Sequence, residues 1–178
     1  RGLEFYDEIK GGHIPKEYVK AVKEGFASAM MNGVLAGFPM QSLKVRLLDG
    51  NFHPVDSDYL AFEIAASLAF KEACKKANSG LLEPIMNLEV VTPEMYIGEI
   101  TGDLNRRRAQ LVGISTRANL QVVKAFVPMS EMFGYVTTLR TLSQGRATSS
   151  MEFSHYMPVP KEITDEIIYR IKGYLVNY

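Results

Sequence analysis

The densest group of chemically distinctive side chains is the run Arg106-Arg107-Arg108. An arginine guanidinium is planar and always charged, and its forked N–H groups suit phosphate oxygens. The same run also fits a solvated helix end, whose positive charge offsets the helix dipole. From charge alone the solvated end is favoured, because isolated basic runs usually face water. Arg140 and Arg146 are expected nearby in the fold and extend this candidate phosphate-contacting set.

A second candidate is the loop Gly50-Asn51-Phe52-His53-Pro54, which puts an aromatic ring and a histidine at the tip of a strand-to-helix connection. Phe52 could stack on a nucleic-acid base, and His53 could hydrogen-bond to RNA. Alternatively, Phe52 folds back onto its own domain. The spacing of the residues leaves both interpretations open.

Motifs of the common catalytic and metal-binding classes are not found. The sequence has no P-loop, HExxH, CxxC or GxSxG pattern, and its three histidines, His13, His53 and His155, lack metal-ligand spacing. Gly11-Gly12 precedes a helix, where a phosphate could bind, but a turn with positive φ is the favoured explanation. We therefore expect no catalytic, cofactor or metal site in this chain.

Composition limits the remaining functions. The chain has 178 residues, of which 47% are hydrophobic and 22% charged, which is typical of one large or two small globular domains. Lys plus Arg equals Asp plus Glu at 20 each, so any RNA contact must be local. The single Cys74 fits a reducing cytosol, and no apolar run is long enough to cross a bilayer. Without a leading methionine or a signal peptide, the chain is expected to be a fragment of a cytoplasmic protein.

The residues to about Leu82 have the pattern of strand, helix, strand, helix. Val19, Val22 and Phe26 follow helical spacing, whereas Leu43, Val45 and Leu47 alternate with charged residues. The expected elements are a strand at Leu3–Ile9, a helix from Pro15 to Asn32, a strand at Leu43–Leu47 and a helix capped by Asp56 or Ser57 that runs to about Ala77.

From Glu83 to Pro158 the pattern becomes strand, helix, strand, strand, helix, strand. This is the split βαβ, ferredoxin-like order, with an antiparallel sheet and both helices on one face. The first helix is expected to reach Arg108, and Gly134 is expected inside the second helix because another backbone approaches closely there. A last helix, striped by Ile163, Ile167 and Ile171, is expected to bury that stripe across the junction of the two domains. The further expected elements are strands at Met86–Val90, Leu111–Ser115, Leu120–Val127 and Met151–Phe153, and a helix along Met132–Leu139 that ends at Gln144-Gly145.

Several long motifs occur in the order of one known family. Leu82-Glu83-Pro84-Ile85-Met86, Gly102 through Arg108, Glu131 through Tyr135, and Gln144 through Phe153 resemble the fifth domain of translation elongation factor G. Gly11 through Tyr18 and Gly50 through Ser57 resemble its fourth domain. The fold class expected is therefore α+β. A partial βαβα unit like the second domain of ribosomal protein S5 spans 1–82, a ferredoxin-like βαββαβ sandwich spans 83–158, and a C-terminal helix and tail span 159–178.

The resemblance implies a ribosome-contacting part of a translational GTPase that promotes tRNA–mRNA translocation. In that family the fourth domain reaches the small-subunit decoding site, and the fifth contacts the large subunit near the GTPase centre. The Gly50–Pro54 loop matches the tip loop, and His53 aligns with the histidine that the eukaryotic counterpart modifies to diphthamide. GTP and Mg²⁺ are implied for an N-terminal domain outside this chain.

Other interpretations stay open from the residues. Met95, Ala109 and the tail Gly173–Tyr178 depart from the family pattern, which leaves room for a paralogue in ribosome recycling or protection. A ferredoxin-like domain could also bind a metabolite, or act as an acylphosphatase-type enzyme, but no glycine-rich loop follows the strand Ile85–Thr92. The opening strands of the fourth domain are not in the chain, so we expect an exposed sheet edge that favours self-association.

Overall fold

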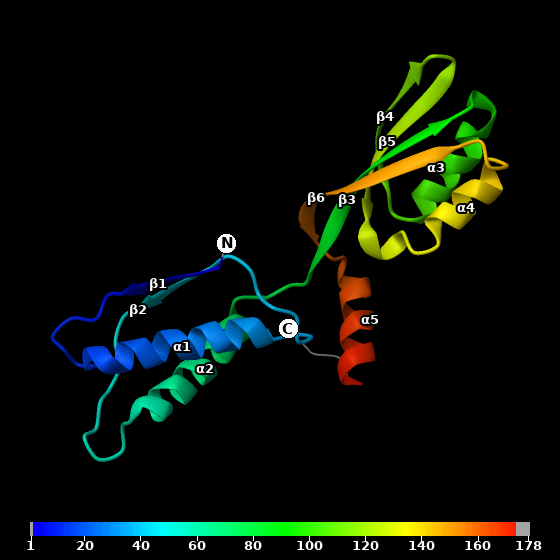
Figure 1. The fold of residues 1–178 in the computed structure, drawn as a ribbon. Helices are drawn as coiled ribbons and strands as arrows, with labels where there is room; N and C mark the ends of the chain where they lie inside the picture. Colours follow the sequence, from blue (N-terminus) through cyan, green and yellow to red (C-terminus); the bar gives the residue numbers. More distant parts are fainter. Residues whose placement is uncertain (1, 174–178) are drawn as a thin grey trace. The chain divides into compact units, whose positions relative to one another are not determined.

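A computed structural model describes residues 2–173, which divide into two units (Figure 1). The first unit runs to Gly80 and resumes at Pro160, and the second comprises Leu81–Val159. Both units contain a sheet and helices, so the α+β class with two small domains is confirmed. The tail after Gly173, including its unusual apolar sequence, lies outside the described residues.

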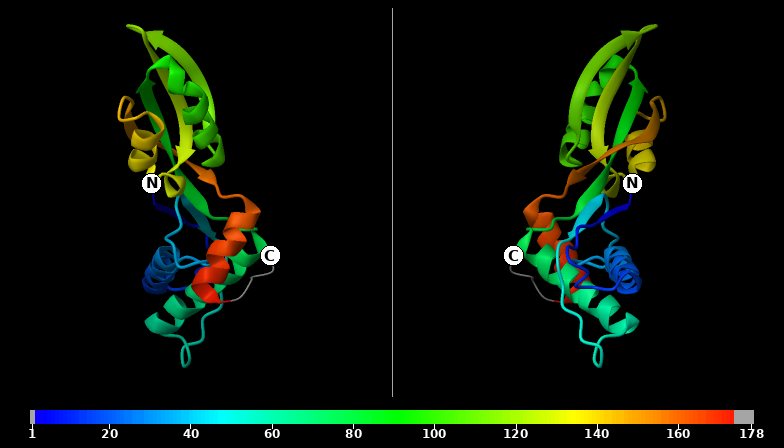
Figure 2. Two further views of the ribbon diagram at one scale, coloured as in Figure 1. Left: turned by 90° about the vertical axis from the view of Figure 1, so that its right-hand side faces the viewer. Right: turned by 90° about the vertical axis from the view of Figure 1, so that its left-hand side faces the viewer.

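The first unit is a two-stranded parallel sheet with two helices. Strand β1 (Leu3–Asp7) pairs with β2 (Leu43–Leu47) along their whole lengths. Because the strands are parallel, the segments that follow them leave the sheet at the same end, where both strands have their C-termini. Helix α1 (Lys16–Asn32) connects the strands, and α2 (Tyr59–Lys76) follows β2 and lies beside α1 (Figure 2). Whether the free edge of this sheet pairs with a second chain stays a prediction.

Helices α1 and α2 pack closely because Gly25 lies between them. A Cβ atom on Gly25 would lie 2.4 Å from the carbonyl oxygen of Glu63. Around this contact the two helices bury Ala21, Val22, Phe62, Ala66 and Phe70. The buried Cys74 belongs to this core, and burial raises the pKa of its thiol.

Helix α2 begins later than predicted. Its N-cap is Asp58, not Asp56 or Ser57, and the Asp58 carboxylate accepts a hydrogen bond of 2.7 Å from the Ala61 backbone N–H. Asp56 and Ser57 belong to the turn before the helix, where both backbone N–H groups donate to the His53 carbonyl. Three carboxylate or hydroxyl residues in a row made the cap position ambiguous from sequence.

The second unit has the predicted ferredoxin-like topology. Its sheet has the strand order β4-β5-β3-β6, with every neighbouring pair antiparallel. Helices α3 and α4 lie on one face of this sheet (Figure 1). Leu88, Val90, Val123, Ile100 and Leu104 form its centre and are at most 1% exposed. The strands are β3 (Leu82–Thr92), β4 (Gln110–Arg117), β5 (Leu120–Pro128) and β6 (Thr148–Pro158), and the helices are α3 (Ile97–Arg106), α4 (Tyr135–Leu142) and the short η1 (Glu94–Tyr96) and η2 (Met129–Glu131).

Two details of this unit differ from the sequence prediction. Helix α3 ends at Arg106, and Arg108 has a left-handed backbone with φ 59°, so the arginine run does not continue the helix. Gly134 is the N-cap of α4 with φ 72°, and a Cβ atom there would meet nothing within 4 Å. The glycine therefore serves a left-handed turn before the helix, and the close backbone approach predicted for it is wrong.

The last helix, α5 (Lys161–Lys172), belongs to the first unit. Its buried residues are Thr164 and Ile168, the latter fully buried, whereas Ile171 is 51% exposed. Ile163 and Ile167 are half-buried at the margins of this face. The predicted stripe is therefore displaced by one residue, because a helix with isoleucines at both 167 and 168 can present either one to the core.

Candidate functional site

The Asp49 side chain joins the segments that follow β1 and β2, at the end of the sheet where both strands have their C-termini. One carboxylate oxygen of Asp49 lies 3.0 Å from the His13 Nδ1 atom and accepts a 2.8 Å hydrogen bond from the Gly50 backbone N–H. His13 comes from the segment after β1, and Asp49 from the segment after β2. The His13 hydrogen bond is the main cause that lowers the pKa of Asp49, followed by the Gly50 N–H. One side chain thus ties two loops together.

The first half of the candidate loop Gly50–Pro54 packs on its own unit. A Cβ atom on Gly50 would lie 2.4 Å from Ile14 Cδ1, so the backbone here lies directly on an apolar side chain. The ring of Phe52 stacks on Tyr18 with centroids 5.5 Å apart, and Tyr18 stacks in turn on Phe62 at 4.9 Å. Phe52 is half-buried in this stack. The sequence left two interpretations open for Phe52. In the structure Phe52 folds back onto its own unit, and its ring stacks on Tyr18.

The second half of the loop turns outward. The His53 backbone N–H donates to the Ser57 hydroxyl at 3.0 Å, and the backbone N–H groups of Asp56 and Ser57 donate to the His53 carbonyl at 3.2 and 2.9 Å. This compact turn leaves Asn51, His53 and Pro54 exposed. Val55 is 93% exposed at the same turn. Sequence reasoning missed Val55, although an isolated aliphatic residue between Pro54 and Asp56 was a signal for it.

A shallow hollow of about 340 Å³ lies beside the Asp49 link. It is lined by Glu8, Lys10, His13, Leu48 and Asp49. At its rim Arg46 binds the Glu8 carboxylate with two hydrogen bonds of 2.6 and 2.8 Å. The Arg46 hydrogen bond is the main cause that lowers the Glu8 pKa. Charges of both signs therefore surround the loop base, and neither Lys10 nor His13 was singled out from the sequence as part of this site.

In the second unit, Arg107 and Arg108 are bound to other residues of the same unit. Arg107 donates to Asp103 at 2.8 Å and to the Thr138 hydroxyl at 3.2 Å, and its guanidinium lies over the Tyr135 ring at 5.1 Å. Arg108 binds both Glu83 oxygens, at 2.7 and 2.9 Å, and Glu131 at 3.0 Å. The Glu83 hydrogen bonds are the main cause that raises the Arg108 pKa. Both guanidiniums connect α3 to other parts of the unit.

The other arginines of the candidate set are exposed. The Arg106 side chain is 74% exposed and its contact with Asp103 is long, at 3.7 Å. Arg140 and Arg146 are also exposed, and Arg146 approaches the Met95 sulfur at 3.8 Å. Since Met95 precedes α3 and Arg106 ends it, Arg146 and Arg106 lie at opposite ends of that helix. The structure therefore does not gather the predicted arginines into one cluster.

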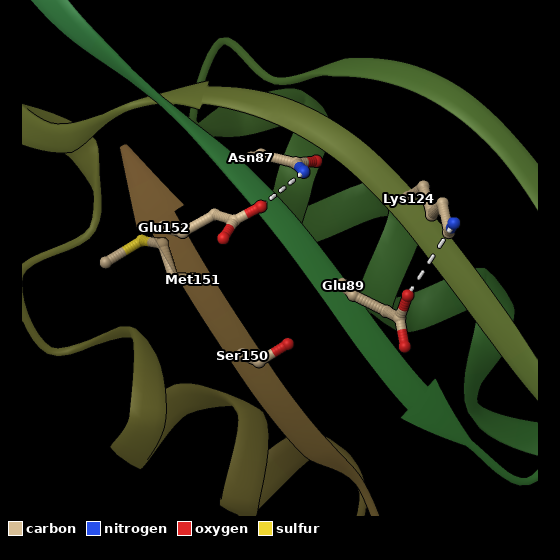
Figure 3. A pocket seen from close by; sticks show the side chains of 6 residues that line it. All are labelled: Asn87, Glu89, Lys124, Ser150, Met151 and Glu152. Atoms are coloured by element: carbon tan, nitrogen blue, oxygen red, sulfur yellow. Dashed lines mark hydrogen bonds and ion pairs between the residues drawn. The ribbon is translucent and has the colours of Figure 1, made fainter. Parts of the chain in front are cut away.

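The open face of the four-stranded sheet carries a polar hollow of about 260 Å³ (Figure 3). Asn87 donates to Glu152 at 3.3 Å, and Glu89 lies 3.8 Å from Lys124 and 3.4 Å from Arg117. The strand predicted at Met86–Val90 includes Asn87 and Glu89, but their partners on β5 and β6 were not predicted. Within residues 2–173 no three His, Cys, Asp or Glu side chains are arranged to hold a metal ion. Over the same residues, no helix is long and apolar enough to cross a membrane.

Comparison with known proteins matches both units to one family. The profile described as "Elongation factor G, domain IV" matches residues 1–78, and "Elongation factor G C-terminus" matches residues 80–167. Proteins named Elongation factor G from Cytophaga hutchinsonii and Amoebophilus asiaticus are 56% and 54% identical to this chain over 176 and 172 residues. These alignments cover 99% and 97% of this chain, but 25% and 24% of the relatives.

A solved structure shares the fold of this chain. The crystal structure of a protein from Thermus thermophilus resembles this chain with a TM-score of 0.83 at 40% identity. The match covers 97% of this chain and 26% of that protein. The chain thus spans about a quarter of the length of the relatives it matches.

Proposed function

The chain belongs to the elongation factor G family, and from this premise we propose that it is the ribosome-contacting C-terminal part of a translational GTPase that promotes tRNA–mRNA translocation. GTP and Mg²⁺ bind to a part of the parent protein outside this chain, and no residue here takes part in hydrolysis. The parent acts in the cytoplasm. Its partners are the ribosome, at the small-subunit decoding site and the large-subunit GTPase centre, and the tRNA–mRNA complex.

The observation that carries this proposal is the outward turn of the loop after β2. His53 and Val55 are exposed on a turn whose backbone is held by Ser57 and whose base is held by Asp49. An imidazole offers two ring nitrogens for hydrogen bonds and a flat face, which suits contact with unstacked RNA bases and ribose hydroxyls. In the proposal this turn enters the decoding site and acts on the tRNA–mRNA complex by contact.

The second unit supplies phosphate contacts in this proposal. Arg106, Arg140 and Arg146 are the exposed members of the candidate set and take the contacts to ribosomal RNA near the GTPase centre. Arg107 and Arg108 hold α3 in place, so they support this surface from within.

The test is a translocation assay on the full-length parent carrying His53→Ala. Phe52 is left unchanged because it packs against the core of the first unit, so its removal would combine a packing defect with any effect on binding. We expect slower tRNA–mRNA movement in pre-steady-state measurements and nearly unchanged ribosome-stimulated GTP hydrolysis, measured in parallel on the same variant. Translocation at the wild-type rate would show that the His53 turn does not act on the tRNA–mRNA complex. If GTP hydrolysis is lost as well, the effect of the substitution is on the structure of the protein.

A further inference from the structure

The hydrogen bond between His13 and Asp49 links the segment after β1 to the loop after β2 and contributes little to overall stability. The His13 and Asp49 side chains are 61% and 70% exposed, and an ion pair at such exposure contributes little to the free energy of unfolding. The same Asp49 oxygen also accepts the Gly50 N–H, which is the first backbone donor of the loop. The link therefore acts on the place where the loop leaves the unit, and only weakly on the core below it.

Besides the apolar contact of Gly50 with Ile14, the loop has three anchors of different kinds. Phe52 is held by aromatic stacking in the core, and the turn is closed by the Ser57 hydroxyl on the His53 N–H. Both of these act within the segment after β2 or on the helices. Asp49 is the hydrogen-bonding anchor that reaches across to the segment after β1, through His13, beside the apolar contact of Gly50 with Ile14. It thus fixes the direction of the loop base relative to the neighbouring loop.

We propose that Asp49 is a positioning residue for the His53 turn. By binding His13 and the Gly50 N–H together, it holds residues 49–57 in one arrangement against the loop after β1, so His53 and Val55 are presented in a fixed direction. A loop that is ordered before it meets its partner loses less conformational entropy on binding. The inference rests on the proposed function, because it assigns Asp49 a part in the contact that His53 makes.

Hydrogen exchange of the loop amides in the full-length parent tests the positioning directly. Asp49→Ala removes both hydrogen bonds, and we expect residues 49–57 to exchange roughly two- to tenfold faster, as the loss of one net hydrogen bond implies. His13→Ala should give a smaller increase, and the double variant should exchange no faster than Asp49→Ala alone, because both substitutions break the same link. Asp49→Asn keeps an oxygen acceptor for Gly50 and should retain most of the protection.

Asp56→Ala is the matched control, since it removes a carboxylate from the same loop. The Asp56 side chain is exposed and has no hydrogen-bond or ion-pair partner among residues 2–173. The substitution should leave loop exchange unchanged, and all variants should melt close to the wild-type temperature. Unchanged loop exchange in Asp49→Ala would overturn the inference.

Translocation separates the inference from the proposed function. We expect Asp49→Ala to slow tRNA–mRNA movement with normal GTP hydrolysis, and Asp49→Asn to restore most of the rate. If His53→Ala slows translocation but Asp49→Ala does not, the positioning role is wrong and the proposed function stands. If neither variant changes the rate, the proposed function fails and the positioning role fails with it.

Discussion

Three consecutive arginines in this chain have different surroundings. Arg106 is the last helical residue and points to solvent, Arg107 caps the helix over Tyr135, and Arg108 turns into a left-handed conformation and reaches Glu83. Their side chains are 74%, 16% and 26% exposed. The residue at which α3 ends decides which guanidinium is exposed to solvent. The sequence shows three guanidinium groups of a type suited to phosphate, but it could not show that two of them are bound within the domain.

Arg108→Gln should destabilise the second unit, whereas Arg106→Gln should not. The Glu83 side chain is only 10% exposed and would lose its counter-charge, so we expect the free energy of unfolding to fall by about 2 kcal/mol, less than for a fully buried pair. Arg106→Gln should stay within about 0.5 kcal/mol of wild type. Chemical denaturation of both variants measures the difference. Equal stabilities would mean that the Arg108–Glu83 pair is screened by solvent despite its geometry.

At the scale of the elements, the periodicity of apolar residues predicted the positions of helices and strands along the chain. It was less successful at predicting which face of each element is buried. The strands predicted at Met86–Val90 and Leu120–Val127 lie within β3 and β5, and the structure buries Leu88, Val90 and Val123. The turn between β4 and β5 falls in the gap between the strands predicted at Leu111–Ser115 and Leu120–Val127, and its residues Ala118 and Asn119 both have positive φ. The isoleucine pattern of α5 predicted the wrong stripe, because the buried face depends on neighbours far away in the sequence.

The candidate loop shows the same limit. Its place between β2 and a helix follows from turn residues, and this part of the prediction matches the structure. The inward direction of Phe52 depends on its stacking against Tyr18, which lies on α1. A local pattern cannot contain that contact. The link between Asp49 and His13 was not predicted for the same reason.

Gly25→Ala tests the close packing of α1 on α2. The added methyl would lie 2.4 Å from the Glu63 carbonyl oxygen and 2.9 Å from Ala66 Cβ, so the two helices must separate. Overpacking of this kind typically costs about 1–3 kcal/mol, and we expect a loss in that range by thermal or chemical unfolding. Gly102→Ala in α3 is the matched control, because its methyl would meet nothing within 4 Å. That variant should gain up to about 1 kcal/mol from helix propensity, and a similar loss in both variants would contradict the packing argument.

For the whole molecule, the charge balance limits how RNA can be bound. Positive and negative residues number 20 each, so no long-range field draws the chain to a polyanion. Many of the cations are paired within the protein, as Arg46 is with Glu8 and Arg117 is with Glu89. Arg106 at the end of α3, Arg140 on α4 and Arg146 in the loop after α4 are exposed at separate places on the second unit. Affinity for RNA should therefore be weak for this chain alone and should come from a few separate phosphate contacts.

Salt dependence of RNA binding measures the number of those contacts. If Arg106, Arg140 and Arg146 each contact one phosphate, the logarithm of the association constant should fall with the logarithm of salt concentration at a slope of about −2 to −3. Replacing all three by glutamine should make the slope nearly flat. Without these contacts, binding no longer releases counterions from the RNA phosphates. Arg117→Gln is the matched control: it removes the same charge from the same unit, but from a guanidinium paired with Glu89, so the slope should stay as in wild type. Fluorescence anisotropy with a labelled ribosomal RNA fragment over a salt series gives both slopes. A steep slope in the triple variant would show that the phosphate contacts are made by other cations, of which Lys16, Lys20 and Lys23 on the exposed side of α1 would be the next to replace.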